Sequence, residues 1–305
     1  MYGKQTTREV ITIKEKAMSF KKKYDIGNKW DQINQKAYLT YISLIVFCIY
    51  GIIADPRIAV TKNTTFFIIM FFSALSMVIL FYRRISPFKN VQPKKYILTL
   101  ITTGYLIATS IENGYNKILI AVNGTSNTLN QEVLDSILKN NPDQHFQYFS
   151  VVSILAPIGE EVLFRGTFLA SILFLGKIFN VKSKRKEYIC FLVITSLLFG
   201  FMHSFDNWLT PFVYVISGLV YGGLYLYSKT IVVPVGIHIL NNSIVAFSEG
   251  KDVNQLAVMI SLVVIAVMIE TIMYSKNKHV LFFRNKISGK KINEKEKLAE
   301  LAKDD

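Results

Sequence analysis

The sequence predicts an all-α, polytopic membrane protein, a bundle of about eight transmembrane helices. Hydrophobic residues make up 51% of the 305 residues. They occur in blocks of about 18–25 residues with few charges, each long enough to cross a bilayer. Lysine and arginine gather between the blocks rather than within them. A soluble fold of this size would instead disperse its apolar residues at the period of a helix or a strand.

The positions of these blocks define the expected organisation of the chain. The spans are expected at about 37–54, 64–82, 96–112, 147–175, 188–205, 209–228, 231–248 and 255–275. They divide the chain into a basic N-terminal tail (1–36), a polytopic membrane domain (37–275) and a charged C-terminal tail (276–305). The longest connection between spans, 113–146, is rich in Asn, Gly and Thr.

The net charge of +14 first suggests a nucleic-acid partner, but the distribution of the basic residues indicates membrane topology instead. With the N-terminus inside, 29 lysines and arginines fall in inner tails and loops and 5 in outer loops. Because cytoplasmic loops retain Lys and Arg, both termini are expected in the cytoplasm and 113–146 on the outer side. We therefore expect a multi-pass protein of the cell membrane, embedded in the lipid bilayer, that binds no nucleic acid. The Lys-, Ile- and Asn-rich composition is typical of a bacterium with an AT-rich genome.

Three ionisable residues interrupt the span expected at 147–175: Glu160, Glu161 and Arg165. A charge at the centre of a bilayer costs about 2.5–3.5 kcal/mol on insertion scales, so such side chains normally face a protein interior or a wet cavity. Glu161 and Arg165 are four residues apart and can form an ion pair on one helix face. Glu160 is rotated by about 100° from Glu161, which leaves its carboxylate free for another task.

Two other spans carry polar residues that can join this carboxylate. His203 closes the sequence Phe199-Gly200-Phe201-Met202-His203, and His238 lies four residues before Asn242, on the same helix face. Glutamate and histidine are the residue types that activate water, directly or through a metal ion. The soluble zinc-protease pattern, two histidines and a glutamate on one helix, does not occur in this sequence.

In their order along the chain, these motifs resemble those of the CPBP family. The family groups type II CAAX prenyl endopeptidases with bacterial bacteriocin-processing and self-immunity proteins, the Abi group. The matching positions are Glu160, Glu161 and Arg165, then Phe199 and His203, then His238 and Asn242. The resemblance covers about 145–250, which would be the protease core, and leaves 1–145 without a family motif.

The resemblance implies an intramembrane endopeptidase that hydrolyses a peptide bond of a membrane-associated peptide or protein. Glu160 would be the general base, and Glu161 and Arg165 would brace the site. His238 and Asn242 would act as ligand or oxyanion-stabilising donors. The cofactor would be a divalent metal, zinc, held by Glu160, His203 and His238. In the alternative mechanism, the same side chains polarise water without a metal.

Two other classes of function fit parts of the sequence. A catalytically idle membrane scaffold or bacteriocin self-immunity protein could share the fold, although the complete set of Glu and His residues favours the enzyme. A secondary transporter could use membrane Glu, Arg and His as a proton path, but the two halves of the chain show no repeat. A prenylated C-terminal peptide, a bacteriocin leader, a signal-peptide remnant and a quorum peptide are all candidate substrates.

Overall fold

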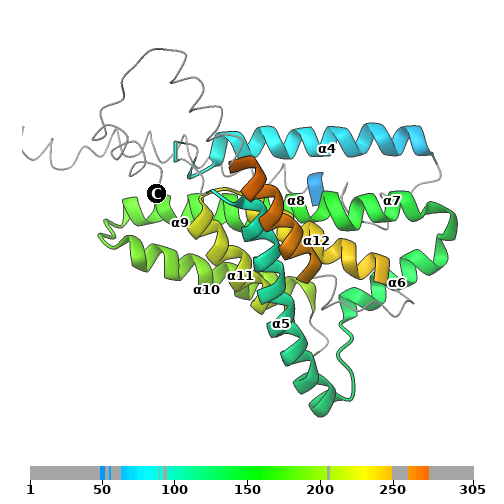
Figure 1. Ribbon diagram of the computed structural model, residues 1–305. Coiled ribbons are helices and arrows are strands. Elements are labelled where there is room, and N and C mark those ends of the chain that lie inside the picture. The colour runs from blue at the N-terminus through cyan, green and yellow to red at the C-terminus, as the bar shows by residue number, and fades with distance from the viewer. Residues whose placement is uncertain are drawn as a thin grey trace, which may run out of the picture. The chain divides into compact units, whose positions relative to one another are not determined.

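The computed structural model describes residues 49–51, 55, 63–88, 90–91, 95–204, 207–248 and 260–274. The chain divides into two compact units, 1–50 and 51–305, and the fold is described here for the second. The predicted tails, 1–36 and 276–305, lie outside the described residues, as does most of the span expected at 37–54. Every regular element in the described part is a helix, which confirms the all-α class (Figure 1).

The first long helices are α4 (Thr64–Ile85) and α5 (Ile97–Asn123). The side chain of Asn63 accepts a hydrogen bond from the Phe66 amide at 3.0 Å and caps the start of α4. Helix α5 ends at Gly124, whose φ of 78° suits a residue without a Cβ. Its length corrects the sequence analysis, which ended this span at 112 because polar residues follow. Those residues continue the helix.

The second half of the expected connection 113–146 is also helical. It contains α6 (Leu129–Asn140) and the 3₁₀ turn η1 (Pro142–Gln144). The Thr128 side chain accepts a hydrogen bond from the Gln131 amide at 3.3 Å, which caps the start of α6. This connection is therefore mostly ordered helix rather than loop.

The span expected at 147–175 is one uninterrupted helical run in which three α-helical segments alternate with two π-helical ones. Its segments are α7 (His145–Ser150), η2 (Val151–Leu155), α8 (Ala156–Glu161), η3 (Val162–Thr167) and α9 (Phe168–Ile178). The segments η2 and η3 are π-helical, a winding that is rare and often found at functional sites. In η3 the Thr167 hydroxyl donates to the Val162 carbonyl at 3.2 Å, which satisfies an acceptor in the widened turn. Helix α4 lies along this run and contacts η2, α8 and η3 (Figure 1).

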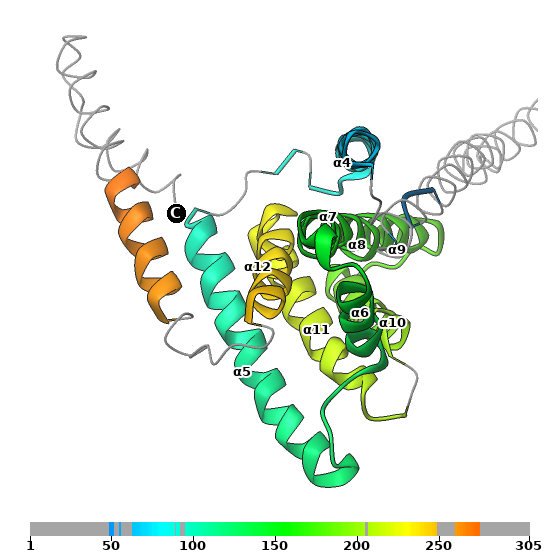
Figure 2. The ribbon, with the colours of Figure 1, turned by 90° about the vertical axis from the view of Figure 1, so that its right-hand side faces the viewer.

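The remaining helices close around this run. They are α10 (Lys184–His203), α11 (Pro211–Ser228), α12 (Val232–Ser248) and a helix at 260–274. Helices α10 and α11 pack against each other, and α11 and α12 both pack against α5. The helix at 260–274 is joined to the start of α5, because Glu270 accepts hydrogen bonds from the Leu98 amide and the Thr99 hydroxyl, each at 2.6 Å (Figure 2).

Close helix packing depends on small residues. A Cβ on Gly200 would lie 2.6 Å from the Pro211 carbonyl oxygen, and one on Gly218 would lie 2.9 Å from the Ser196 Cα. Both contacts are between α10 and α11. Glycine at these positions lets the two backbones approach closely, as is common between membrane helices.

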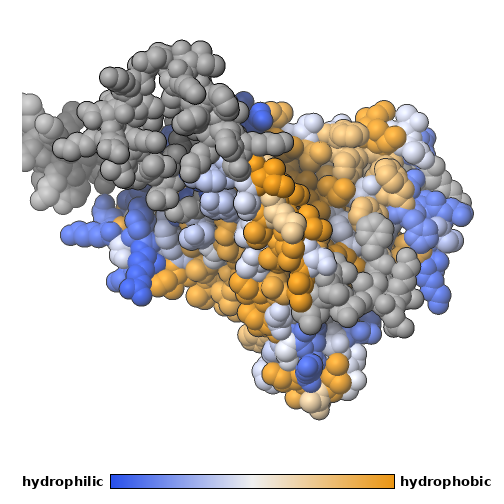
Figure 3. Space-filling model, viewed as in Figure 1, coloured by the Kyte–Doolittle hydropathy of each residue, from blue (hydrophilic) through white to orange (hydrophobic). Residues whose placement is uncertain are grey.

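The exterior of the described helices fits a lipid environment. Thr64–Ile85, Lys184–His203 and Pro211–Ser228 are long and apolar enough to cross a membrane, and Val232–Ala246 and Ile260–Tyr274 are shorter apolar helices. Phe66, Ile69 and Phe72 on α4 are each more than half exposed, which suits contact with lipid rather than water. Apolar side chains cover the middle of the face in Figure 3, and hydrophilic ones gather towards its ends. The all-α membrane fold predicted from the sequence is confirmed.

Candidate active site

The polar residues singled out in the sequence come together from α8, η3, α10 and α12. Glu160 and Glu161 are the last residues of α8, and Arg165 lies one turn later in η3. His203 is the last residue of α10, and His238 lies near the middle of α12.

Arg165 is fully buried and held by Glu161 and by aromatic rings. Its Nε lies 2.9 Å from Glu161 Oε2, an ion pair whose atoms lack the alignment of a hydrogen bond. The guanidinium carbon lies 4.7 Å from the centre of the Phe199 ring and 5.5 Å from that of Tyr221. Nη2 also donates to the Gly218 carbonyl at 3.4 Å. The charge is thus compensated by one carboxylate and by aromatic faces, which suits a guanidinium removed from water.

Glu161 also contacts a distant helix. Its Oε1 lies 3.0 Å from His238 Nδ1, and the Glu161 side chain is completely buried. Because a carboxylate paired with arginine can only accept, His238 Nδ1 carries the proton in this contact. In its neutral form, the His238 ring presents the lone pair of Nε2 on its other side.

The ring of His203 is fixed in a similar way. Its Nδ1 lies 2.6 Å from the Phe199 carbonyl oxygen, which can only accept, so Nδ1 is the donor. The ring stacks on Tyr214 with centroids 4.6 Å apart and lies 4.4 Å from the Phe199 ring. In the neutral ring, Nε2 is again the atom with the free lone pair.

Both Nε2 atoms face the same oxygen of Glu160. Glu160 Oε2 lies 3.4 Å from His203 Nε2 and 3.9 Å from His238 Nε2. This oxygen is buried and has no hydrogen-bond partner among the described residues, although the Glu160 side chain as a whole is 30% exposed. With both imidazoles neutral, three acceptors converge here and are complementary to a hydrogen-bond donor placed between them. A water molecule is the simplest such donor, and it can give its two hydrogens to two of the three acceptors.

Asn242 contributes to the site from one turn beyond His238, without contacting Glu160. Its Nδ2 donates to the Val152 carbonyl at 2.9 Å, which ties α12 to the π-helical segment η2. Asn242 therefore holds η2, and through it α8, against α12.

A cavity of about 420 Å³ opens beside these residues. Glu160, His203, His238 and Asn242 line one part of it. Residues of α5 and α6, together with the connection between them, line another part. Glu161 and Arg165 do not line the cavity, so the two adjacent glutamates serve different sides of the helix.

The similarity of this region to known proteins agrees with its geometry. Residues 142–244 match the family model of the type II CAAX prenyl endopeptidase Rce1-like proteins. These residues form an Rce1-like domain. This match and the relative below support the resemblance to the CPBP family that the three motifs predicted. The chain is also 30% identical over 161 residues to the membrane-embedded CAAX protease MroQ of Staphylococcus aureus (strain USA300). That match covers 52% of this chain and 60% of the relative. No solved structure matches the chain.

All six site residues predicted from the sequence lie within the Rce1-like domain, but the cavity extends beyond it. The sequence analysis missed Glu112, which lies on α5, is buried and lines the cavity. Its Oε1 accepts a short hydrogen bond from the hydroxyl of Ser217 on α11. The signal was present in the sequence, an acid beside an apolar block, and was interpreted as the end of a span.

Within the part of the chain that the structure describes, no three His, Cys, Asp or Glu side chains are arranged as a group that could hold a metal ion. Zinc bound by Glu160, His203 and His238 stays a prediction, and no chemical step is assigned to it.

Proposed function

We propose that this protein is an intramembrane endopeptidase that hydrolyses a peptide bond of a membrane-associated peptide or protein. The observation that carries the proposal is the convergence of His203 Nε2 and His238 Nε2 on the unpartnered Oε2 of Glu160 at the wall of a cavity. The Rce1-like domain supports it, because type II CAAX prenyl endopeptidases cleave peptides.

In the proposed reaction, Glu160 is the general base. A water molecule held by Glu160 gives a proton to the carboxylate as its oxygen attacks the carbonyl carbon of the peptide bond. The same proton is then delivered to the departing amine nitrogen, which restores the carboxylate and releases an acid and an amine. Since glutamate both takes up and returns the proton, the side chain is regenerated in each turnover.

The two histidines and the buried pair of Glu161 and Arg165 support Glu160 in this reaction. Through the lone pairs of their Nε2 atoms, His203 and His238 would accept hydrogen bonds from the water molecule and orient it beside Glu160. Glu161 supports the reaction indirectly, because its contact with His238 Nδ1 selects the tautomer and orientation of that ring. Arg165 compensates the charge of Glu161, so that the burial of one carboxylate does not impose a second negative charge on the reaction.

The proposal is tested by comparing membranes that contain wild type with those containing Glu160→Gln, which keeps the shape of the side chain but cannot act as the base. New peptide N-termini in the membrane proteome are identified by mass spectrometry. A matched control is Glu132→Gln, because Glu132 is exposed on α6. New N-termini with wild type and with the control, but not with Glu160→Gln, are the expected result. Cleavage that survives in a folded Glu160→Gln protein would remove the proposed base, and cleavage by none of the three would favour a binding or self-immunity function.

The predicted zinc ion is tested separately, by elemental analysis of purified wild type beside His203→Ala. Near-stoichiometric zinc in the wild type that disappears in the variant would assign Glu160, His203 and His238 as ligands. A wild type that cleaves peptide without zinc, and in the presence of a chelator, would assign water activation to the side chains alone.

A further inference from the structure

The cavity contains a second carboxylate that the proposed reaction does not use. Glu112 is 8% exposed and lies on α5, outside the Rce1-like domain. Its Oε1 accepts the hydrogen bond of Ser217, and among the described residues no lysine, arginine or histidine forms an ion pair with it. A single hydroxyl donor leaves most of the acceptor capacity of a carboxylate unused.

A buried acid of this kind needs compensation. Removing an ionised carboxylate from water is costly unless it is paired, so the group either stays neutral or receives a cation. A neutral acid would serve only as a hydrogen-bond partner of Ser217. A cation has to come from outside the described helices, and the cavity is the route by which it can arrive.

A second acceptor lies one helical turn away. Asn116 is four residues after Glu112 and therefore on the same face of α5, and it also lines the cavity. Its Oδ1 is buried and has no hydrogen-bond partner among the described residues. An unsatisfied amide oxygen and an incompletely paired carboxylate on one face together call for a ligand that donates several hydrogen bonds.

The charge of the cavity favours the same kind of ligand. Its lining includes the carboxylates of Glu112 and Glu160 and two imidazoles, but no described lysine or arginine. Arg165 is fully buried outside this lining and is paired with Glu161. A cavity with two acids and no permanent cation attracts positively charged groups.

We propose that Glu112 and Asn116 form a subsite for a positively charged group of the peptide substrate, an ammonium or guanidinium, while Glu160 acts on the peptide bond. The inference rests on the proposed function and adds a substrate class to it. The positive group can be a lysine or arginine side chain, or the free amino terminus of the peptide. Binding there would fix which bond lies beside Glu160, because both carboxylates line the same cavity.

Binding is measured on the full-length Glu160→Gln protein in detergent, so that no probe is cleaved. The probes are fluorescent apolar decapeptides that carry one lysine at successive positions, each paired with a norleucine peptide that keeps the side-chain stem. Every pair is prepared with a free and with an acetylated amino terminus. Fluorescence anisotropy gives the dissociation constants. The norleucine comparison separates charge from apolar contact, and acetylation separates the two sources of the positive group.

At one position, or at the free amino terminus, the charged peptide is expected to bind about tenfold or more tightly than its neutral partner. Adding Glu112→Gln should abolish that preference, and Glu112→Asp should restore part of it. The control Glu132→Gln should leave it unchanged, because Glu132 is exposed on another helix. A preference that persists in Glu112→Gln, a preference at no position, or no binding by any peptide would overturn the subsite.

The two proposals fail in different ways. If wild type cleaves peptides but shows no charge preference, the endopeptidase stands and the subsite is wrong. If the preference depends on Glu112 but wild type cleaves none of the peptides, the subsite stands and the hydrolytic function is wrong.

Discussion

Glu161 Oε1 lies 3.0 Å from His238 Nδ1, although the two residues are 77 positions apart in the chain. Because the other oxygen of Glu161 faces Arg165, one carboxylate connects a cation in its own helical run to an imidazole on α12. The contact turns His238 Nε2 towards Glu160. In the proposed reaction, Glu161 would therefore position His238 beside the carboxylate of Glu160.

The buried pair predicts coupled stabilities for Glu161 and Arg165. Arg165→Leu leaves a buried carboxylate without its cation, which typically costs about 3–5 kcal/mol. The variant is expected to unfold at a clearly lower temperature in detergent. Adding Glu161→Gln should recover part of the loss, because no uncompensated charge remains. Strict additivity of the two single changes would show that the side chains do not stabilise each other.

Close packing of α10 on α11 predicts that Gly200 tolerates no side chain. In Gly200→Ala the new methyl group would lie 2.6 Å from the Pro211 carbonyl oxygen, so the helices must move apart. Overpacking of this kind costs about 1–3 kcal/mol. The control is Gly223→Ala on α11, where a Cβ meets nothing within 4 Å. That change should leave the unfolding temperature unchanged or raise it. Equal effects of the two substitutions would argue against the close approach at Gly200.

The bridge from Asn242 to Val152 predicts a structural effect for a conservative change. Asn242→Asp keeps the size of the side chain but removes the Nδ2 donor, which leaves the Val152 carbonyl without its partner. Loss of one partner of a buried hydrogen bond costs about 1–3 kcal/mol. The unfolding temperature should fall, and peptide cleavage should fall with it, because η2 continues directly into α8. Unchanged thermal unfolding would show that the bridge contributes nothing to stability.

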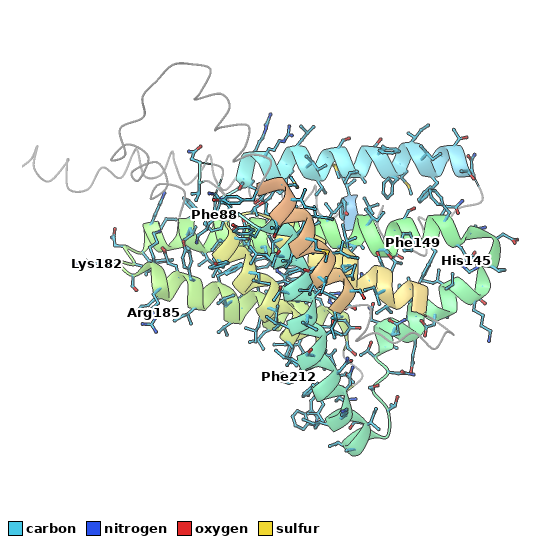
Figure 4. All side chains as sticks on the ribbon, viewed as in Figure 1. Phe88, His145, Phe149, Lys182, Arg185 and Phe212 are labelled. Carbon is cyan, nitrogen blue, oxygen red and sulfur yellow. The ribbon has the colours of Figure 1, made fainter. Side chains whose placement is uncertain are left out.

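The topology predicted from charge can be tested with one position on each expected side of the membrane. Lys182 and Arg185 lie at one end and His145 at the other (Figure 4). In a background without Cys48 and Cys190, a single cysteine at Lys182 should react with an impermeant reagent only from the cytoplasmic side. One at Asn123, the exposed end of α5, should react only from outside. Labelling with the two sides exchanged would reverse the orientation.

The sequence predicted the helices well where hydropathy alone decides them. The structure has α4 at Thr64–Ile85 and α11 at Pro211–Ser228, against expected spans of 64–82 and 209–228. It was wrong about the end of α5, because Glu112 and the two residues after it look like a loop when their neighbours are unknown. Burial of Glu112 against Ser217 and the cavity makes this acidic residue compatible with a helix inside the bundle.

The contacts within one helical run could be predicted from the sequence, because helix geometry fixes which nearby residues share a face. The pairing of Glu161 with Arg165 follows from a spacing of four residues, and the structure has their charged atoms 2.9 Å apart. The contact of Glu161 with His238 could not be read from spacing, because it depends on how α12 docks against α8. The function of Asn242 was likewise hidden, since its partner is a backbone carbonyl that carries no sequence signal.

The hydrogen bonds from the start of α5 to Glu270 join two helices that both lie outside the Rce1-like domain. The side chains that we propose to activate water all belong to the matched stretch, residues 142–244. Part of the lining of their cavity comes from α5, which precedes that stretch and is hydrogen-bonded to the helix at 260–274 that follows it. Substitutions in α5 can therefore change which peptides fit the cavity, while the residues of the proposed reaction stay the same.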